Sequence, residues 1–153
     1  MRVCLGGTFD PLHAGHKQLL TTALQLAGLS GSVLIGVTTG GFPPGKYTRA
    51  SYETRVEALQ RFLQRQHPSA AVSIVPIMDP FGPAVDAELD AIVVSPETRP
   101  TAERLNTQRE QKRKPRLRIV EVPFVLAADG RPISSTRIRQ GEITPDGAIL
   151  HHG

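Results

Sequence analysis

Residues 6–16, GGTFDPLHAGH, carry the clearest structural signal in the chain. The residues before this stretch, 2–6, are short and apolar and predict a buried strand. The residues after it, 15–27, carry apolar side chains at helical spacing, and Gly28 is a predicted C-cap. The stretch is therefore a glycine-rich turn from strand into helix. At such a turn the backbone can approach a ligand closely, and the helix start offers N–H groups to an anion.

The alternation of strand and helix continues along the chain. Short apolar runs predict four further strands, at 32–38, 71–78, 91–95 and 117–122. Ser51 is the predicted N-cap of a second helix, and a third helix is predicted over 98–112, with Pro100 in its first turn or before its regular part. Crossover helices between parallel strands are typical of α/β proteins, so we expect an open sheet of five parallel strands.

Composition points to a single globular domain covering residues 1–153. Hydrophobic residues make up 39% of the chain, and no apolar run approaches the ~20 residues that a membrane span needs. Met1 leads directly into the first predicted strand, and the single cysteine, Cys4, cannot form an internal disulfide. These features predict a cytoplasmic protein that does not associate with a membrane.

The net charge of +4 and the pI near 9.7 fit either nucleic acid or small polyphosphate ligands. Aromatic residues make up only 5% of the chain, and the densest basic stretch, 109–118, has none interleaved for base stacking. We interpret that stretch as a solvated helix end and strand start. The sequence therefore predicts no nucleic-acid partner, and it makes no prediction about oligomeric state.

Two histidines stand at the start of the first predicted helix. His13 and His16 are three residues apart, so at least one imidazole can point into a cleft at the carboxyl edge of the sheet. A donor there would stabilise charge that develops on a transferring phosphate. For His13 a structural or supporting role is favoured, and for His16 a functional one. A zinc site is not expected because no third ligand accompanies the pair, and Asp10 is expected to fix the loop through local backbone N–H groups.

A second candidate phosphate site lies near the C-terminus, in PISSTRIR, residues 132–139. Ser134 or Ser135 can cap a short helix whose N–H and hydroxyl groups face an anion, and Arg137 adds positive charge there. Taken alone, such a Ser-Ser-Thr turn is more often an ordinary N-cap.

The loop after the second predicted strand, 40–49, is shaped by glycines and prolines. Lys46 and Arg49 are its only cations. This composition suits a mobile loop that closes on an anionic acceptor, although from spacing alone a solvent-exposed lysine is an equally good interpretation.

The GTFD and HxGH elements, followed far along the chain by ISSTRIR, resemble the signature of the HxGH nucleotidyltransferase superfamily. The resemblance implies a Rossmann-like, doubly wound parallel sheet. It also implies that the HxGH histidines bind the phosphates of ATP and that an acceptor attacks the α-phosphate directly, without a covalent enzyme intermediate.

The middle of the chain narrows the resemblance. The segments DPFGPA at 79–84 and DAIVVSPET at 90–98, and the ending AADGRPISSTRIRQGEI, are similar to phosphopantetheine adenylyltransferases of the archaeal and eukaryotic type. Two features depart from that pattern: Phe81 replaces a common tyrosine, and Arg99-Pro100-Thr101 replaces a glycine-containing turn. The implied reaction is transfer of AMP from ATP to 4'-phosphopantetheine.

The resemblance also implies residue roles. Catalytic roles fall on His16 and Lys46, and acceptor binding falls on Thr8 and Lys46. Nucleotide binding falls on Gly7, Thr8, Phe9, His13, His16, Ser134, Ser135, Thr136 and Arg137. Arg109 either reaches the nucleotide or faces solvent, and the sequence does not decide between the two. Mg²⁺ is expected on the ATP phosphates, and no protein ligand for it can be named.

Two alternatives remain at this point. One is a sibling transferase that forms FAD, NAD or CDP-glycerol, although the last would usually carry an RTxGIST-like motif in place of ISSTRIR. The other is a non-catalytic module that binds nucleotide or RNA, which the basic charge balance suggests. The presence of His13, His16, Lys46 and Arg137 argues against it.

Overall fold

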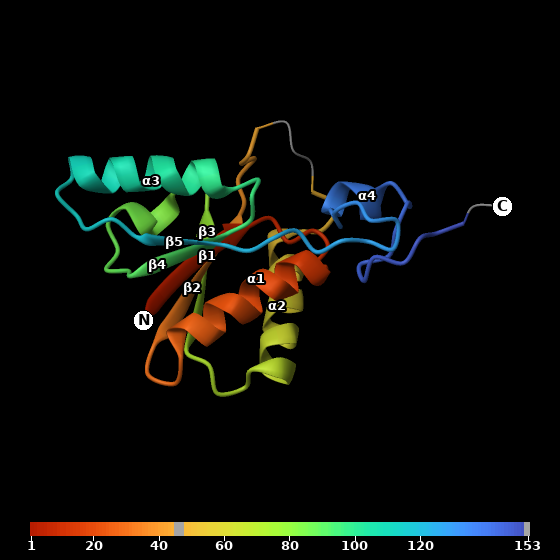
Figure 1. The fold of residues 1–153 in the computed structure, drawn as a ribbon, viewed down its shortest axis with the longest axis horizontal. Helices are drawn as coiled ribbons and strands as arrows, with labels where there is room; N and C mark the ends of the chain where they lie inside the picture. The colour runs from red at the N-terminus through yellow and green to blue at the C-terminus, as the bar shows by residue number, and fades with distance from the viewer. Residues whose placement is uncertain (45–47, 152–153) are drawn as a thin grey trace.

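Five parallel strands form one sheet in the computed structural model, which describes residues 1–44 and 48–151 (Figure 1). The strands are β1 (Arg2–Gly7), β2 (Ser32–Thr38), β3 (Val72–Ile77), β4 (Ala91–Val94) and β5 (Arg118–Glu121). Their order across the sheet is β3-β2-β1-β4-β5, and every pairing is parallel. This is a doubly wound, Rossmann-like order, which confirms the fold class expected from the sequence.

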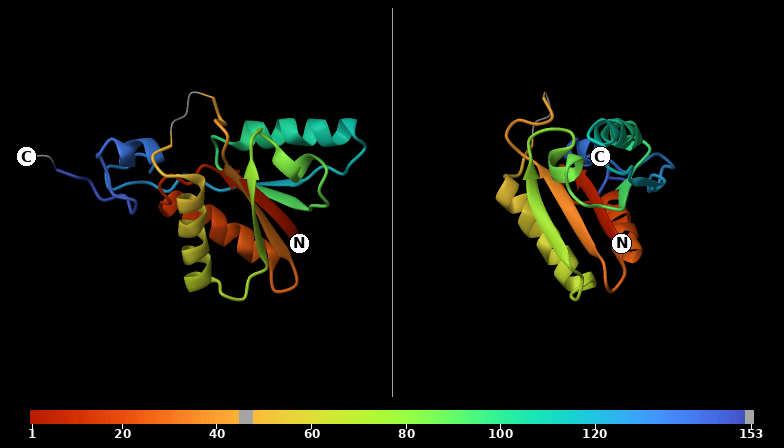
Figure 2. Two further views of the ribbon diagram at one scale, coloured as in Figure 1. Left: turned by 180° about the vertical axis from the view of Figure 1, so that it is seen from behind. Right: turned by 90° about the vertical axis from the view of Figure 1, so that its left-hand side faces the viewer.

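Helices cover both faces of the sheet. The helices α1 (Ala14–Ala27) and α2 (Tyr52–Gln66) pack on one face, whereas the 3₁₀ helix η1 (Gly82–Val85) and α3 (Arg99–Gln111) pack on the other (Figures 1 and 2). The short helix α4 (Ser135–Arg139) lies beyond the strand ends, beside the C-terminal segment. No helix among the described residues is long and apolar enough to cross a membrane.

The strands supply side chains alternately to the two faces, as a pleated sheet requires. On the face of α1 and α2, Val3 and Leu5 join a core with Leu20 and Leu59. On the opposite face, Cys4 packs in a second, smaller core with Leu105, Leu117, Leu34 and Ile92. A third cluster, which we call the satellite core, lies beyond the sheet and contains Ala127, Ile133 and Ile143, with Ile138 of α4 packed against it.

The predicted helix boundaries hold within about one residue. Ser51 caps α2 by accepting a hydrogen bond from the Thr54 backbone N–H at 3.1 Å, and Gly28 ends α1 with φ of 69°. Pro100 sits in the first turn of α3, where its missing N–H breaks no hydrogen bond of the helix.

The sheet opens between β1 and β4. β1 pairs with β2 along its whole length, from Arg2 with Ser32 to Gly7 with Val37. Its pairing with β4 covers only Val3 and Cys4, so the carboxyl halves of the two strands separate. This is the topological switch point of the fold, where α/β proteins of this type bind ligands.

Candidate active site

Two cavities lie at the carboxyl ends of the strands and share a wall. The first, of about 320 Å³, we call the motif cavity, and the second, of about 440 Å³, we call the apolar cavity. Both volumes fall in the range of small-molecule sites. The residues common to both linings are Gly6, Gly7, Thr8, Val93, Glu97 and Thr98. A ligand in one cavity can therefore reach a ligand in the other at the end of β1.

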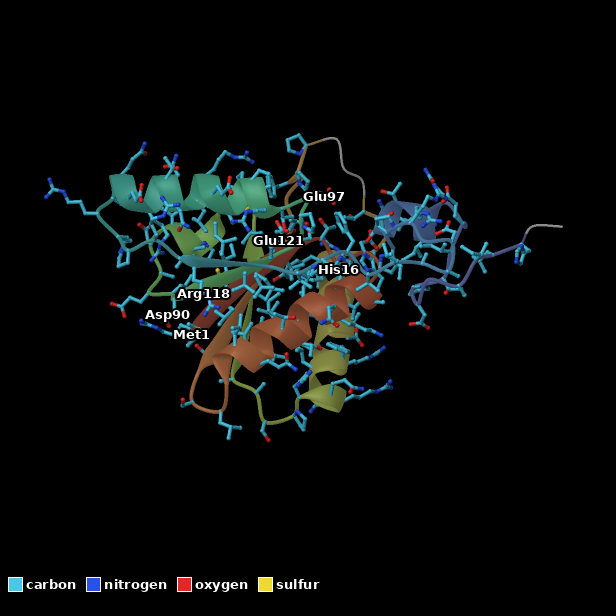
Figure 3. All side chains as sticks on the ribbon, viewed as in Figure 1. Met1, His16, Asp90, Glu97, Arg118 and Glu121 are labelled. Atoms are coloured by element: carbon cyan, nitrogen blue, oxygen red, sulfur yellow. The ribbon has the colours of Figure 1, made fainter. Side chains whose placement is uncertain are left out.

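The motif cavity has two walls that are far apart in the sequence. The first wall is the turn from β1 into α1, and Figure 3 shows His16 at the amino-terminal end of α1. The second wall is the segment that leads into α4. The polar lining residues of the two walls are Thr8, His13, His16, Ser134, Ser135, Thr136 and Arg139. The structure thus brings together the two motifs that the sequence singled out as phosphate-binding.

The two histidines of the first wall cap α1 reciprocally. His13 Nδ1 accepts hydrogen bonds from the backbone N–H groups of Gly15 at 3.0 Å and His16 at 3.4 Å. His16 Nδ1 in turn accepts from the backbone N–H of His13 at 3.2 Å, and the two rings stack with centroids 3.7 Å apart. Because Nδ1 is the acceptor in each neutral ring, the proton resides on Nε2. Each imidazole therefore has Nε2–H as its second hydrogen-bonding group.

His13 is a buried helix cap, which is the structural role that its position at the start of the helix favoured. Burial lowers the pKa of its imidazole to about 4, so the ring is neutral near pH 7. Gly15 is required by this arrangement, since a Cβ there would lie 2.9 Å from Cε1 of His13. The glycine in the HxGH motif thus makes room for the capping ring.

Thr8 stands where the two cavities meet, and its hydroxyl belongs to a short relay. The Thr38 hydroxyl at the end of β2 donates to Thr8 Oγ1 at 2.9 Å, and both residues are buried. With its oxygen accepting from Thr38, the hydroxyl of Thr8 keeps its own hydrogen to donate. Thr8 can therefore offer a hydrogen bond to an anion at the junction of the cavities.

The second wall places one predicted phosphate-binding residue outside the cavity lining. Arg137, expected to hold phosphate, is not among the residues that line the motif cavity. Its guanidinium binds Asp129 at 2.5 Å and Glu142 at 2.8 Å, and it also donates to the Pro132 carbonyl at 3.1 Å. The Arg137 guanidinium in turn holds the pKa of Asp129 down at about 2. Two carboxylates pair with this side chain, and these contacts tie α4 to the segments on either side of it.

The arginine that faces the motif cavity is Arg139. Its Nη1 donates to the carbonyl oxygen of Asp10 at 2.5 Å, which joins the second wall to the first. The carboxylate of Asp10 accepts from the backbone N–H of Arg49 at 2.6 Å, and Arg49 donates to the Arg139 carbonyl at 2.7 Å. The sequence led us to expect local backbone N–H groups as the partners of Asp10, but the N–H that it binds is 39 residues away, in the loop after β2.

Ser134, rather than Ser135, is the N-cap of α4, where its hydroxyl accepts from the Arg137 backbone N–H at 3.2 Å. Ser135 and Thr136 follow it on the lining of the motif cavity. Gly7 and Phe9 also line this cavity, and the ring of Phe9 lies 4.9 Å from that of His16.

Arg109 takes neither of the two positions that the sequence left open. Its side chain is buried, and it donates to the carbonyl oxygens of Ala84, Ala87 and Pro115 at 2.7, 2.9 and 2.9 Å. It faces no solvent and lines neither cavity. It fastens α3 to η1 and to the turn before β5, so we leave it out of the nucleotide site.

The apolar cavity lies over β1, β2 and β3 and is bounded by η1 and the start of α3. Apolar side chains dominate its lining, among them Leu34, Ile77, Phe81, Ile92 and Leu105. Phe42 and Pro43, from the loop after β2, also line it. Lys46, the predicted acceptor-binding residue of that loop, lies outside the described residues.

Sequence reasoning missed three polar residues here. Thr38 and Arg139 are described above, and Glu97 is the only carboxylate in the linings of the two cavities, as far as the described chain shows. The second arginine of ISSTRIR was a visible signal, but spacing does not tell which side of a five-residue helix faces a ligand.

A parallel sheet with both motifs gathered at its switch point defines an α/β protein of the nucleotidyltransferase class.

The comparison with known families assigns the chain to one of them. It belongs to the Cytidylyltransferase-like family, which matches residues 4–141. It is 48% identical to the phosphopantetheine adenylyltransferase of Methanopyrus kandleri, over 93% of this chain and 90% of that protein. It is 42% identical to the protein of the same name from Methanosarcina mazei, over 97% of this chain and 96% of that one.

A solved structure shares the fold of this chain. The crystal structure of a protein of unknown function from Archaeoglobus fulgidus superposes with a TM-score of 0.72 at 36% identity, covering 80% of this chain and 89% of that one. The chain thus groups with the phosphopantetheine adenylyltransferases of archaea, which confirms the resemblance drawn from the sequence.

Proposed function

We propose that this chain is a pantetheine-phosphate adenylyltransferase of coenzyme A biosynthesis. It transfers AMP from ATP to 4'-phosphopantetheine and forms dephospho-coenzyme A and pyrophosphate. The observation that carries the proposal is the pair of cavities that meet at Thr8, one lined by hydroxyl, imidazole and guanidinium groups and the other by apolar side chains. Adenylyltransferase relatives at 40–48% identity support the same conclusion.

The two substrates divide between the two cavities. The triphosphate of ATP needs donors and positive charge, which Ser135, Thr136 and Arg139 provide in the motif cavity. The pantetheine arm is long and largely uncharged, and it suits the apolar cavity. In this placement its terminal phosphate lies at Thr8, beside the α-phosphate of ATP. We assign Lys46, from the loop that borders the apolar cavity, to hold that acceptor phosphate.

The reaction needs positioning and charge stabilisation more than proton transfer. A phosphate monoester oxygen attacks the α-phosphorus of ATP, the bond to the bridging oxygen breaks, and pyrophosphate leaves with that electron pair. The attacking group is already ionised near pH 7, so no strong general base is required. His16, as an Nε2–H donor, and the Thr8 hydroxyl stabilise the α-phosphate as negative charge builds on it. Neutral His13 holds His16 in place through the shared cap.

Magnesium fits this site as a companion of ATP. Within the described part of the chain, His, Cys, Asp and Glu side chains form no group of three or more that could hold a metal ion. Mg²⁺ takes most of its ligands from phosphate oxygens and water, and it would neutralise charge on the triphosphate. The protein's contribution is then to hold the phosphates through Ser135, Thr136 and Arg139.

The test is pyrophosphate release measured with ATP and 4'-phosphopantetheine. Parallel reactions supply FMN or nicotinamide mononucleotide with ATP, and glycerol 3-phosphate with CTP, to examine the sibling transferases. We expect release only with ATP and phosphopantetheine. Release with another pair would reassign the substrate. Folded protein that releases no pyrophosphate with any pair, but binds RNA in a salt-dependent manner, would favour the non-catalytic module.

A further inference from the structure

Arg55 is a buried cation directly beneath the junction of the two cavities. It lies in α2 and is 5% exposed. Its Nη1 donates to the carbonyl oxygens of Thr8 at 3.0 Å and Thr38 at 2.8 Å, and its Nε donates to that of Ala50 at 3.2 Å. One guanidinium therefore joins the turn after β1, the end of β2 and the end of the loop that contains Lys46.

Within the described part of the chain, no carboxylate forms an ion pair with this guanidinium. Its hydrogen bonds go to neutral carbonyl oxygens. Burying a charge is costly unless it is compensated. Arg109 shows that a buried guanidinium among carbonyls can serve the fold alone, so it is the position of Arg55 beside Thr8 and Thr38 that points to a role at the site.

Arg55 also controls the hydroxyl that faces the junction. It holds the backbones of Thr8 and Thr38, and the hydroxyl of Thr38 donates to that of Thr8. The direction of the Thr8 hydroxyl therefore depends on the backbones of Thr8 and Thr38, and one guanidinium holds both. We expect a shift of Arg55 to displace the two threonines together.

We propose that Arg55 is a positioning residue for adenylyl transfer. It fixes Thr8 at the point where the acceptor phosphate meets the α-phosphate of ATP, and it places a buried positive charge behind that point. A preorganised charge in a water-poor site stabilises developing negative charge more than it stabilises a bound ground state. This inference rests on the proposed function, and it predicts an effect on kcat larger than that on KM.

The rival explanation is that Arg55 only supports the fold, and the chain contains a matched control. Arg109 is also buried and also donates to three backbone carbonyls, but none of its three partners is Thr8 or Thr38, the lining residues that Arg55 holds. The variants Arg55→Met and Arg109→Met remove the same group from the same kind of environment. If Arg55 only supports the fold, both variants should show similar losses of thermal stability and similar changes in kcat.

The experiment measures kcat, KM for each substrate and thermal midpoint in both variants and in Arg55→Lys. We expect Arg55→Met to lose roughly 100-fold in kcat, with KM for ATP changed by less than about threefold. Arg55→Lys keeps the charge and should recover part of the loss. Arg109→Met should lose thermal stability while the folded fraction keeps its kcat. Equal kcat in folded Arg55→Met and wild type would overturn the proposal.

A double-mutant cycle keeps the proposal testable if Arg55→Met fails to fold. Thr38→Val cuts the hydroxyl relay and leaves Arg55 in place, and Arg55→Lys combined with Thr38→Val should lose less than the sum of the two single effects. Additive losses, or full activity in Thr38→Val, would count against action through Thr8. A wild-type enzyme that prefers another acceptor would refute the proposed substrate alone, since the same cycle can be run with that acceptor.

Discussion

The two walls of the motif cavity are built in different ways. The first wall, the turn from β1 into α1, continues directly from a central strand, and Phe9 within it is buried in the main core. The second wall, at α4, belongs to the satellite core beyond the sheet. It meets the first wall through a few specific contacts, including Arg139 with Asp10 and the backbone hydrogen bond from Ala14 to Pro145.

This difference separates two tasks. The first wall fixes the groups that we propose act on the α-phosphate, since His16 and Thr8 are held by the helix cap and by the hydroxyl of Thr38. The second wall carries groups suited to the outer phosphates on a small unit with its own core. Changes in the first wall should therefore reduce the chemical step most, and changes in the second should reduce ATP affinity or stability.

The largest expected effect is at His16. Removing its Nε2–H donor in His16→Ala should lower kcat by about 10³-fold, because a donor to developing phosphate charge contributes chiefly in the transition state. Steady-state kinetics with saturating ATP and 4'-phosphopantetheine would measure this.

His16 also helps to cap α1, so its variant needs a control for structure. In His16→Glu a carboxylate at the third helical position can still accept from the His13 backbone N–H, as in a capping box, but it offers no donor to phosphate. We expect a thermal midpoint near that of the wild type and a kcat at least as low as that of His16→Ala. Substantial activity in either variant would show that the first wall does not act on the α-phosphate through His16.

The second wall offers a pair of arginines two residues apart. Arg139→Met should lower kcat/KM for ATP by roughly 10- to 100-fold, the usual effect of losing a hydrogen bond to a charged group. Arg137→Met should lower the thermal midpoint through the loss of Asp129 and Glu142 as partners, and it should keep kcat/KM for ATP within a few-fold of the wild-type value. The reverse pattern would restore Arg137 as the phosphate-binding residue.

The smallest expected effect is a pH dependence of stability in the first wall. Burial lowers the pKa of His13 to about 4 in the folded protein, from about 6.5 in an unfolded chain. Between these two values the unfolded state binds more protons, so this contribution to stability is complete above pH 6.5 and is lost as pH falls toward 4.

The comparison variant is His13→Asn, which keeps a good N-cap but does not titrate in this range. Denaturant unfolding of both proteins from pH 7.5 to 4.5 should give free energies of unfolding that decline more steeply for the wild type. Parallel curves would mean that His13 is not desolvated as the structure indicates.

Most of the fold could be predicted from the sequence because the short apolar runs of the strands and the helical spacing of apolar residues were both clear. Apolar runs located all five strands within about one residue, and Ser51 and Gly28 marked helix ends by standard cap chemistry. The switch point followed from parallel topology. The satellite core did not, since Ala127, Ile133 and Ile143 belong to loops and a single short helix with no repeating pattern.

The lining of the candidate site could be predicted in part. His13 and His16 line the motif cavity together with Ser134–Thr136, whereas Arg109 and Arg137 do not line it. The spacing did hold one unused signal: Arg55 lies four residues before Leu59, and Leu59 four before Leu63, so helical periodicity places this charge on the buried face. An arginine in an amphipathic helix is ordinarily taken as a surface residue, so the burial of Arg55 was not predicted.

The most direct test of the whole account is the reverse reaction. Wild-type protein would be incubated with dephospho-coenzyme A and radiolabelled pyrophosphate, and the products separated by chromatography. If the two cavities hold an adenylyl group between two phosphates, pyrophosphate attacks the α-phosphorus, and labelled ATP appears with an equal amount of 4'-phosphopantetheine. Label that remains in pyrophosphate while the folded protein binds dephospho-coenzyme A would contradict the account.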